Sequence, residues 1–391
     1  MDFKFSPEDD TFRHDLQGFV RAELPPDWES FDRFPGGHDW DLTRQMRKKL
    51  ADRGWLTMHW PEAYGGQDAS PVRSTIYNEE MAYLRAPGRD IFGVRMLGPT
   101  LMIHGTEEQR QAHLPLVAKG EVQWCQGYSE PESGSDLASL STRAVRDGDD
   151  FVINGSKIWT SLAHRADWIM LLTRTNPDAP KHRGISFILV DMKSPGIEVR
   201  PIGNMAGGQE FNEVVFDNVR VPRRNVVGEE DRGWYVAVTL LDFERSGIDY
   251  SAGARRLLDD VRGYAAETRR SGQVLLETPW VRNLLADRYI ECEVARLIAY
   301  NVAYMQGEGQ VPNKEASMSK VFGSETQHRS TVAAVEILGP YGALKQGDRL
   351  APLRGQVPEN WMISFSHTIA AGTSEVQRNI IASRGLGLPR G

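Results

Sequence analysis

Hydrophobic positions recur at helical spacing over the first third of the chain. Leu42, Met46 and Leu50 lie four residues apart in the segment 41–53, which ends before a glycine. This spacing predicts an amphipathic helix. Further helices are predicted from residue 7 onward, at 72–84, at 96–103 and from 107 onward. Ser6-Pro7 and Thr106-x-x-Gln109 are typical helix starts, a capped first turn and a capping box.

From about residue 125 the pattern changes to short apolar runs separated by turns, which predicts a β-domain. The runs lie at 151–153, 168–173, 185–190, 197–199 and 214–216. Between the first of these and the segment 157–161 stands Asn154-Gly155, a strong signal for a two-residue hairpin turn.

Beyond about residue 231 helical spacing returns in long segments, several of them over twenty residues, which is typical of antiparallel bundle helices. They are predicted at 233–250, 254–270, 280–306, 314–338 and 375–384. The order of helices, sheet and helices indicates an α+β protein with three domains. Their predicted bounds are 1–124, 125–230 and 231–391. No strand is followed by Gly-x-Gly-x-x-Gly, which argues against a Rossmann fold.

Composition excludes several classes of function. The net charge is −7 and no basic stripe appears, so a nucleic-acid partner is not expected. No apolar run reaches the length of a membrane span, so no membrane insertion is expected. The two cysteines and nine histidines have no metal-ligand spacing, so we expect no metal site and no disulfide. These features fit a cytoplasmic protein.

The segment 126–161 concentrates the candidate chemistry. A loop of hydroxyls and carboxylates, Tyr128 to Asp136, is followed by a strand that carries Trp159 between polar residues. Hydrogen-bonding groups beside an indole suit a flat aromatic ligand with polar edges. An ordinary surface loop leading into a hairpin is the other interpretation that these residues allow.

Five motifs in order resemble those of the acyl-CoA dehydrogenase family. They are Ser129-Glu130-Pro131-x-x-Gly134-Ser135-Asp136, Asn154-Gly155-x-Lys157-x-Trp159-x-Ser161, Gly184-Ile185-Ser186-Phe187-Ile188-Leu189-Val190, Leu241-Asp242-Phe243-Glu244-Arg245 and Gly372-Thr373-Ser374-Glu375-Val376-Gln377-Arg378. The resemblance covers nearly the whole chain. It implies an acyl-CoA dehydrogenase-like fold with an N-terminal helical domain, a middle β-domain and a C-terminal bundle of the four-helix type.

The resemblance also implies a reaction. FAD would lie between the β-domain and the bundle, and an acyl-CoA would lie against the flavin. The acyl thioester would be dehydrogenated to the trans-2-enoyl thioester, as in fatty acid metabolism. Electrons would then pass to an electron-transfer flavoprotein.

The position of the catalytic base departs from the commoner family pattern. Many members carry a glutamate directly before the Gly-Thr of the last motif, where this chain has Ala371. A second branch of the family carries the base on the first helix after the β-domain, and the matching residue is Glu244. Ala237, Leu241, Glu244 and Ile248 would form one inward stripe on the predicted helix 233–250, where burial raises the pKa of a carboxylate. The alternative is a buried glutamate paired with arginine.

Other site residues follow from the resemblance alone. The backbone N–H of Ala371 would donate to the thioester carbonyl, and Arg245 would help to hold Glu244 or the CoA. An ion pair of Arg245 on the helix surface is the alternative. Ser135 would contact the pyrophosphate or the substrate. The residues expected at the cofactor are Tyr128, Ser129, Ser135, Trp159, Ser161, Thr373 and Glu375.

Family members usually complete the FAD site with a neighbouring subunit, and two elements of that half-site depart here. Ser271 stands where a phenylalanine is usual, and Glu336 where a glutamine is usual. Four interpretations remain open. The chain forms a homo-oligomer of four or two copies, or it is a subunit of a hetero-oligomer with a related chain. It is an oxygen-using monooxygenase or oxidase on the same fold, or it is a binding module that kept the fold.

Overall fold

The computed structural model describes residues 5–26, 28, 39–243 and 247–389. Contacts divide the chain into two compact units. The bundle unit comprises 1–33, 69–86 and 245–391, and the sheet unit comprises 34–68 and 87–244. The predicted order of helices, sheet and helices is found along the chain.

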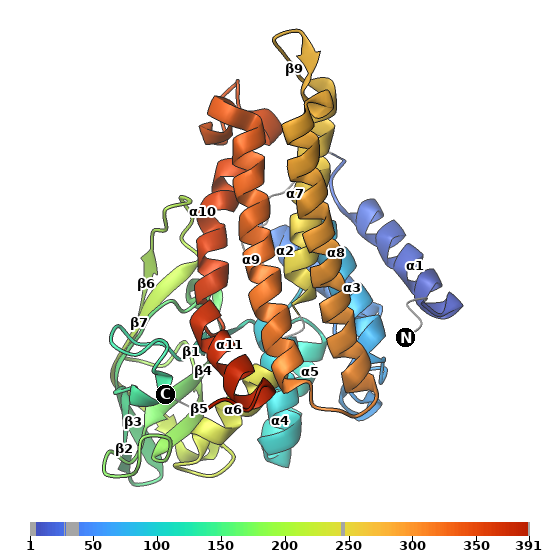
Figure 1. The fold of residues 1–391 in the computed structure, drawn as a ribbon. Helices are drawn as coiled ribbons and strands as arrows, with labels where there is room; N and C mark the ends of the chain where they lie inside the picture. The colour runs from blue at the N-terminus through green and yellow to red at the C-terminus, as the bar shows by residue number, and fades with distance from the viewer. Residues whose placement is uncertain (1–4, 27, 29–38, 244–246, 390–391) are drawn as a thin grey trace. The chain divides into compact units, whose positions relative to one another are not determined.

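In the described part of the sheet unit, eight strands form one sheet in the order β6-β7-β3-β2-β4-β5-β8, with β1 beside β4 (Figure 1). The strands are β1 (Trp124–Gly127), β2 (Arg143–Asp147), β3 (Asp150–Lys157), β4 (Trp168–Arg174), β5 (Ile185–Asp191), β6 (Ile197–Ile202), β7 (Phe211–Pro222) and β8 (Val226–Val227). Phe151, Ile188 and Val219 belong to the apolar core that these strands enclose. The four strand runs predicted beyond residue 165 are confirmed as β4 to β7.

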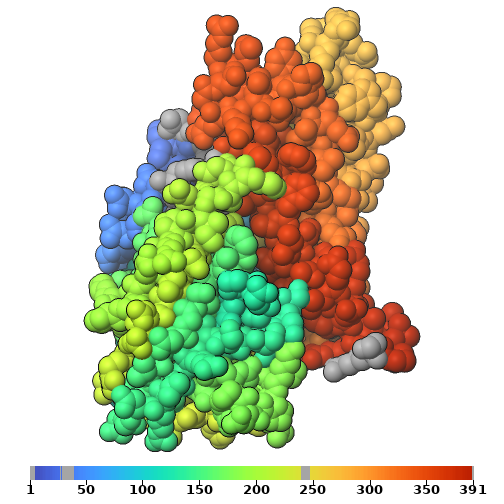
Figure 2. Space-filling view, turned by 90° about the vertical axis from the view of Figure 1, so that its left-hand side faces the viewer, coloured from blue at the N-terminus to red at the C-terminus, as the bar shows by residue number. Residues whose placement is uncertain are grey.

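Helices complete the sheet unit. They are α2 (Trp40–Asp52), α4 (Gly98–His104), α5 (Glu107–Ala118) and α6 (Gly233–Phe243), with a π-helical turn at Ile91–Leu97 before α4. The capping box predicted at the start of α5 is present, because Thr106 and Gln109 each bond the other's backbone N–H. Residues between about 125 and 220, green in Figure 2, form a broad stretch of surface on the face shown.

The bundle unit is built from long helices that run side by side (Figure 1). They are α7 (Ile248–Glu267), α8 (Pro279–Gly307), α9 (Asn313–Leu338) and α10 (Gln356–Ile369). Helix α3 (Pro71–Tyr83) packs on α7 and α8, α1 (Pro7–Glu23) packs on α3, and α11 (Ser374–Ile380) packs on α9. A short hairpin, β9 (Arg269–Arg270) with β10 (Gln273–Val274), joins α7 to α8. Leu258, Val281 and Ile337 belong to the core of this unit.

The predicted hairpin turn at Asn154-Gly155 is wrong. β3 runs through both residues, and the turn lies earlier, between β2 and β3 at Gly148. The register of β3 against β7 shifts between Ile153 and Gly155, which marks a bulge. Gly155 has φ +145°, and an added Cβ would lie 2.7 Å from the Thr142 Cα. A close approach of two backbones therefore explains this glycine.

The predicted continuous helix 233–250 is also wrong. α6 ends at Phe243 and α7 begins at Ile248, and Gly247 before it has φ +72° in the left-handed region. That conformation cannot continue a right-handed helix. The predicted stripe therefore joins residues of two different helices. Glu244 and Arg245 lie outside the described residues.

Candidate functional site

The loop after β1 is tied to β3 by a buried ion pair. The Lys157 Nζ lies 2.7 Å from the Glu130 Oε1, and it also donates to the Tyr128 carbonyl at 3.1 Å. The Glu130 carboxylate accepts the backbone N–H groups of Ser141 and Thr142 at 2.6 and 2.9 Å. Both charged side chains are buried. The start of the Tyr128–Asp136 loop is thus fixed by charge-assisted hydrogen bonds.

The pair is ionised at neutral pH. Burial alone would raise the pKa of the Glu130 carboxyl, but the Lys157 charge and the hydrogen bonds lower that pKa to about 2. Burial lowers the pKa of Lys157 to about 8, although Glu130 opposes this shift. Each group compensates the charge of the other, as a buried pair requires.

The predicted residues of this loop have different surroundings. Tyr128 is buried, with its ring edge-on to Phe187 at 6.4 Å between centroids. The Ser129 carbonyl accepts the Ile158 N–H at 2.9 Å, which fixes Ser129 against the end of β3. Ser135 is exposed, and its neighbour Asp136 forms an ion pair with Lys181.

Trp159 follows β3 in a strained and exposed position. Its φ is +60°, a region that bulky residues rarely adopt. The indole is 57% exposed and meets only the edge of Phe211 among the ring contacts seen in the described residues. Ser161, two residues on, is half-buried. An apolar ring on a strained backbone at the surface is typical of a binding site.

In the bundle unit, Ala371 lies in a tight left-handed turn. Ala371 has φ +54° and Gly372 has φ +83°. The Gln377 Nε2 donates to the Ala371 carbonyl at 3.0 Å, and an added Cβ on Gly372 would lie 2.5 Å from that nitrogen. Within the described residues, the Ala371 N–H donates to no acceptor. The turn leaves this N–H available to a ligand.

Thr373 and Glu375 begin α11. The Thr373 Oγ1 accepts the Val376 N–H at 3.2 Å and caps the helix. Glu375 is exposed, and hydrogen bonds from its own backbone N–H and from the Thr373 hydroxyl lower its pKa. Capping accounts for both residues in this structure, and their contact with a cofactor stays a prediction.

Gly247, which precedes α7, lies against α9. An added Cβ on Gly247 would lie 2.5 Å from the Ser319 Oγ. Because any larger residue would meet α9 and could not adopt φ +72° without strain, Gly247 is required at this crossing.

The two elements expected to serve a neighbouring subunit meet at one end of the bundle. Ser271, with φ +50°, and Gly272 form the tip of the β9–β10 hairpin. The Arg270 guanidinium donates to the Leu338 carbonyl at the end of α9, two residues beyond Glu336. Glu336 is exposed. Both residues that depart from the family pattern are exposed, and each lies within two residues of a partner in this hydrogen bond.

Several buried polar atoms next to the predicted site residues have no hydrogen-bond partner among the described residues. They are the Ser133 Oγ and Thr160 Oγ1 in the sheet unit, and the Ser374 Oγ and Gln377 Oε1 in the bundle unit. Buried polar groups are normally satisfied, so such atoms indicate a polar ligand or water. Within the sheet unit, the two unpaired hydroxyls and the exposed indole of Trp159 fit a flat cofactor with polar edges, such as FAD.

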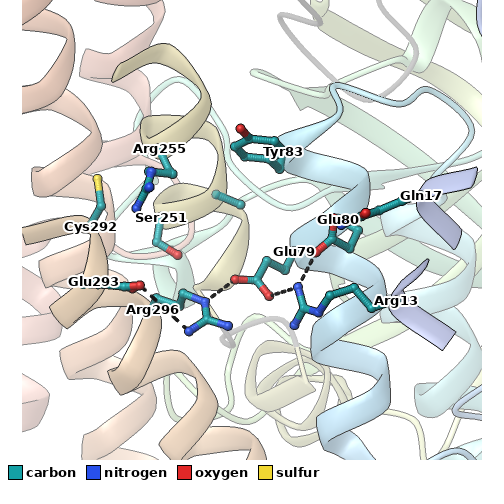
Figure 3. A pocket seen from close by; sticks show the side chains of 11 residues that line it. Arg13, Gln17, Glu79, Glu80, Tyr83, Ser251, Arg255, Cys292, Glu293 and Arg296 are labelled. Atoms are coloured by element: carbon teal, nitrogen blue, oxygen red, sulfur yellow. Dashed lines mark hydrogen bonds and ion pairs between the residues drawn. The ribbon is translucent and has the colours of Figure 1, made fainter. Parts of the chain in front are cut away.

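A polar cavity of about 230 Å³ lies elsewhere in the bundle unit, among α1, α3, α7 and α8. Figure 3 shows Glu79 between the guanidinium groups of Arg13 and Arg296. The cavity lining carries three arginines and three glutamates, so its charges balance. Of the predicted site residues that the structure describes, none lines it.

Sequence reasoning missed three contributors to this site. Glu130 and Lys157 stood in quoted motifs, but no role was predicted for them. Gln377 belongs to the last motif, and its hydrogen bond to the Ala371 carbonyl was not predicted. The buried pair could have been suspected from the sequence, because Glu130 and Lys157 are charged residues of opposite sign inside two motifs of the β-domain.

Comparison with known proteins identifies the class to which this fold and site belong. The models of the acyl-CoA dehydrogenase N-terminal, middle and C-terminal domains match residues 6–121, 125–219 and 231–386. The chain belongs to the acyl-CoA dehydrogenase family. It is an acyl-CoA dehydrogenase, a flavoprotein oxidoreductase, with an N-terminal helical domain, a middle β-sheet domain and a C-terminal helical domain. The predicted family and fold class are confirmed.

Individual relatives are similar over the whole chain. The acyl-CoA dehydrogenase FadE26 of Mycobacterium tuberculosis is 36% identical over 400 residues, covering 100% of this chain and 99% of that protein. The structure of the steroid acyl-CoA dehydrogenase Tcur3481-Tcur3483 matches with a TM-score of 0.92 and 36% identity, over 100% of both chains. The ChsE4-ChsE5 complex of M. tuberculosis matches with a TM-score of 0.90 and 37% identity, again over 100% of both chains. No described helix is long and apolar enough to cross a membrane.

Proposed function

We propose that this chain binds FAD and dehydrogenates an acyl-CoA thioester to the trans-2-enoyl-CoA, with Glu244 as the base. Bound FAD supplies the acceptor for the hydride that leaves the β carbon. The protein holds the thioester, removes the α proton and shields the flavin from water. The observation that carries the proposal is the turn at Ala371, which offers a backbone N–H where many relatives carry the base.

The Ala371 N–H supports the polarisation of the thioester. It would donate to the thioester carbonyl and stabilise the negative charge that develops there when the α proton leaves. Such a donor is worth about 3–4 kcal/mol of transition-state stabilisation. Since the contact uses only backbone, it survives the absence of a glutamate side chain. The hydrogen bond from Gln377 to the Ala371 carbonyl keeps the turn in place.

The base must then come from another position. Alanine at 371 cannot accept a proton, and Glu244 matches the position that a second branch of the family uses. It lies between α6 and α7, where the chain passes from the sheet unit to the bundle unit. Within the site, Trp159 would cover the flavin ring, Ser129 and Ser161 would bond its edge, and Ser135 would reach the pyrophosphate.

The decisive variant is Glu244→Gln, which keeps the side-chain shape and removes the basic group. We expect turnover to fall by at least about 10³-fold, within the range that single catalytic groups contribute, while FAD remains bound. The matched control is Glu267→Gln, an exposed glutamate at the end of α7 that should have no effect on turnover. Near-normal turnover in Glu244→Gln would remove Glu244 from this role.

The relatives support a proposal for the substrate class. Tcur3481-Tcur3483 is described as a steroid enzyme, and a base on the earlier helix suits long, branched or ring-bearing acyl groups. We therefore propose a bulky, ring-bearing acyl-CoA. The test is a panel of straight-chain, branched and steroid-type acyl-CoAs, assayed on FAD-loaded protein with an electron-acceptor dye. The kcat/KM values rank the three kinds of acyl group.

Reduction by the substrate under anaerobic conditions also separates a dehydrogenase from an oxygen-using flavoprotein. Rapid bleaching of the flavin followed by slow reoxidation in air supports electron transfer to a flavoprotein carrier. Fast reoxidation with peroxide release would favour an oxidase.

A further inference from the structure

The chain beyond β3 contains two residues in the left-handed region, separated by two residues. Trp159 and Leu162 both have φ +60°, and neither is a glycine. Such backbone is strained and persists only where the surroundings fix it. Burial does not account for it at Trp159, because more than half of the indole surface is exposed. Another part of the sheet unit must hold this segment.

Asn212, the second residue of β7, holds it. The Asn212 carbonyl accepts the Thr160 N–H at 3.0 Å, and the Asn212 Nδ2 donates back to the Thr160 carbonyl at 2.9 Å. The same Nδ2 donates to the Glu210 carbonyl at 3.2 Å, and that carbonyl accepts the Leu162 N–H at 2.9 Å. Asn212 is fully buried. Backbone groups next to both strained residues are therefore bonded to Asn212 or to its neighbour.

The side-chain amide of Asn212 has one orientation that satisfies all its neighbours. Since Nδ2 faces two carbonyls, it must be the donor, and Oδ1 then faces the His164 Nδ1 at 3.2 Å. Oδ1 can only accept, so the His164 Nδ1 carries the proton. Each polar atom of this buried amide thus has a partner, which is typical of a residue that fixes geometry.

The residue before Trp159 is fixed as well. The Ile158 N–H donates to the carbonyl of Ser129, a predicted flavin-binding residue. Phe211, which precedes Asn212, meets the Trp159 indole edge-on, with 6.3 Å between ring centroids and an interplanar angle of 85°. Trp159 therefore stands between two anchored residues while its ring remains accessible.

We propose that Asn212 is a positioning residue that clamps Thr160 and so holds Trp159 in the strained conformation that presents its indole to the flavin. The inference rests on the proposed binding of FAD. It adds a residue that none of the five family motifs contains. The alternative role for Asn212 is simply to tie β7 to the segment after β3, with no effect on Trp159.

The first test compares FAD affinity among asparagine variants of the full-length protein. In Asn212→Ala and Asn212→Asp, the Kd for FAD should rise by about tenfold or more, the loss expected for a hydrogen bond of ordinary strength. Asn225→Ala is the matched control, because the Asn225 Nδ2 also donates to a backbone carbonyl of the sheet, that of Leu189, at 2.8 Å. Unchanged FAD affinity in both Asn212 variants would overturn the proposal.

The second test measures the backbone strain at position 159 through Tm and needs no cofactor. Trp159→Gly and Trp159→Ala both remove the indole, but only glycine relieves the positive φ. The full-length glycine variant should therefore unfold at the higher Tm of the two. In an Asn212→Ala background the segment can relax, so this order should disappear or reverse. A higher Tm for alanine in the normal background, or an order that Asn212→Ala leaves unchanged, would overturn the clamp.

The two tests separate failure of this inference from failure of the proposed function. If the unmodified protein binds no FAD, the proposed function fails, and the Tm comparison at position 159 still decides whether Asn212 holds the strain. If the protein binds FAD and is reduced by an acyl-CoA, but the Asn212 variants bind FAD equally well, the function stands and the positioning role is refuted.

Discussion

The buried pair of Glu130 and Lys157 is the residue-scale contact that most directly fixes the site loop. Removing one member leaves the other charge uncompensated in the interior, so Lys157→Met should lower the free energy of unfolding by about 3–5 kcal/mol. The double variant Lys157→Met/Glu130→Gln should recover much of that loss, because no unpaired charge remains. Urea denaturation of the three proteins measures both effects. A double variant no more stable than Lys157→Met would contradict this explanation.

The same pair predicts a pH dependence. The folded-state pKa of Glu130 is about 2, below its ordinary value of 4.5. The stabilisation that Glu130 contributes is therefore fully present above pH 4.5 and is lost as the pH falls towards 2. Tm measured across this interval should fall less steeply in the double variant than in the unmodified protein.

Residue types could be predicted from the sequence, but their pairing could not. Glu130 and Lys157 are 27 positions apart, and their contact depends on how the loop folds back on β3. The strain at Trp159 is likewise invisible in the sequence, because tryptophan is a rare choice for positive φ. Asn212 carried no signal at all, since an isolated asparagine usually lies in a turn.

At the scale of elements, α1 is held to α3 and α8 through Glu79. Its carboxylate accepts from Arg13 of α1 at 2.8 Å, and from Arg296 and Tyr300 of α8. Burial alone would raise the pKa of Glu79, but the charges of Arg296 and Arg13 lower it below its ordinary value. The stabilisation is therefore present at neutral pH and is lost as the pH falls below the ordinary range of glutamate.

Glu79→Gln should accordingly release α1. The variant removes the carboxylate that two partly buried guanidinium groups share, leaving Arg13 paired with Glu80 alone, so amide hydrogen exchange in residues 7–23 should become faster at neutral pH. Glu293→Gln is the control, because Glu293 is half exposed and lies 4.0 Å from the Arg296 Nη1. Equal exchange in α1 in the two variants would show that Glu79 does not hold this helix.

Element predictions succeeded where periodicity was long and failed at glycines. The bundle helices α8 and α9 and the strands β4 and β5 were predicted within a few residues, since burial imposes their period over many positions. The conformations at Asn154-Gly155 and at Gly247 were predicted wrongly, and one reason explains both errors. A glycine marks a special conformation, but the sequence does not say whether it is a turn, a bulge or a helix break.

At the scale of the whole molecule, five separated motifs identified the family, although each alone was weak. Local patterning supplied the order of helices and sheet. It could not supply the site, because the candidate groups come from segments more than 240 residues apart, such as Ser129 and Ala371. Only the matching of several motifs in order carries that information. The identity of a partner chain also cannot be read from one sequence.

The FAD half-site at Ser271 and Glu336 bears on how the chain assembles. The half-site surface at Ser271 and Glu336 departs from the family pattern, and an exposed carboxylate near a pyrophosphate weakens binding by charge repulsion. The ChsE4-ChsE5 complex shows that a related chain assembles with a second one. We therefore expect the chain expressed alone to retain little FAD, and co-expression with a related chain that has the usual phenylalanine and glutamine to yield a mixed oligomer that retains more.

Purified mass and the FAD-to-protein ratio measure this outcome. Glu336→Gln with Ser271→Phe provides the internal control, because it should raise FAD retention in the chain expressed alone. A homo-oligomer that binds one FAD per chain without these substitutions would contradict the hetero-oligomer.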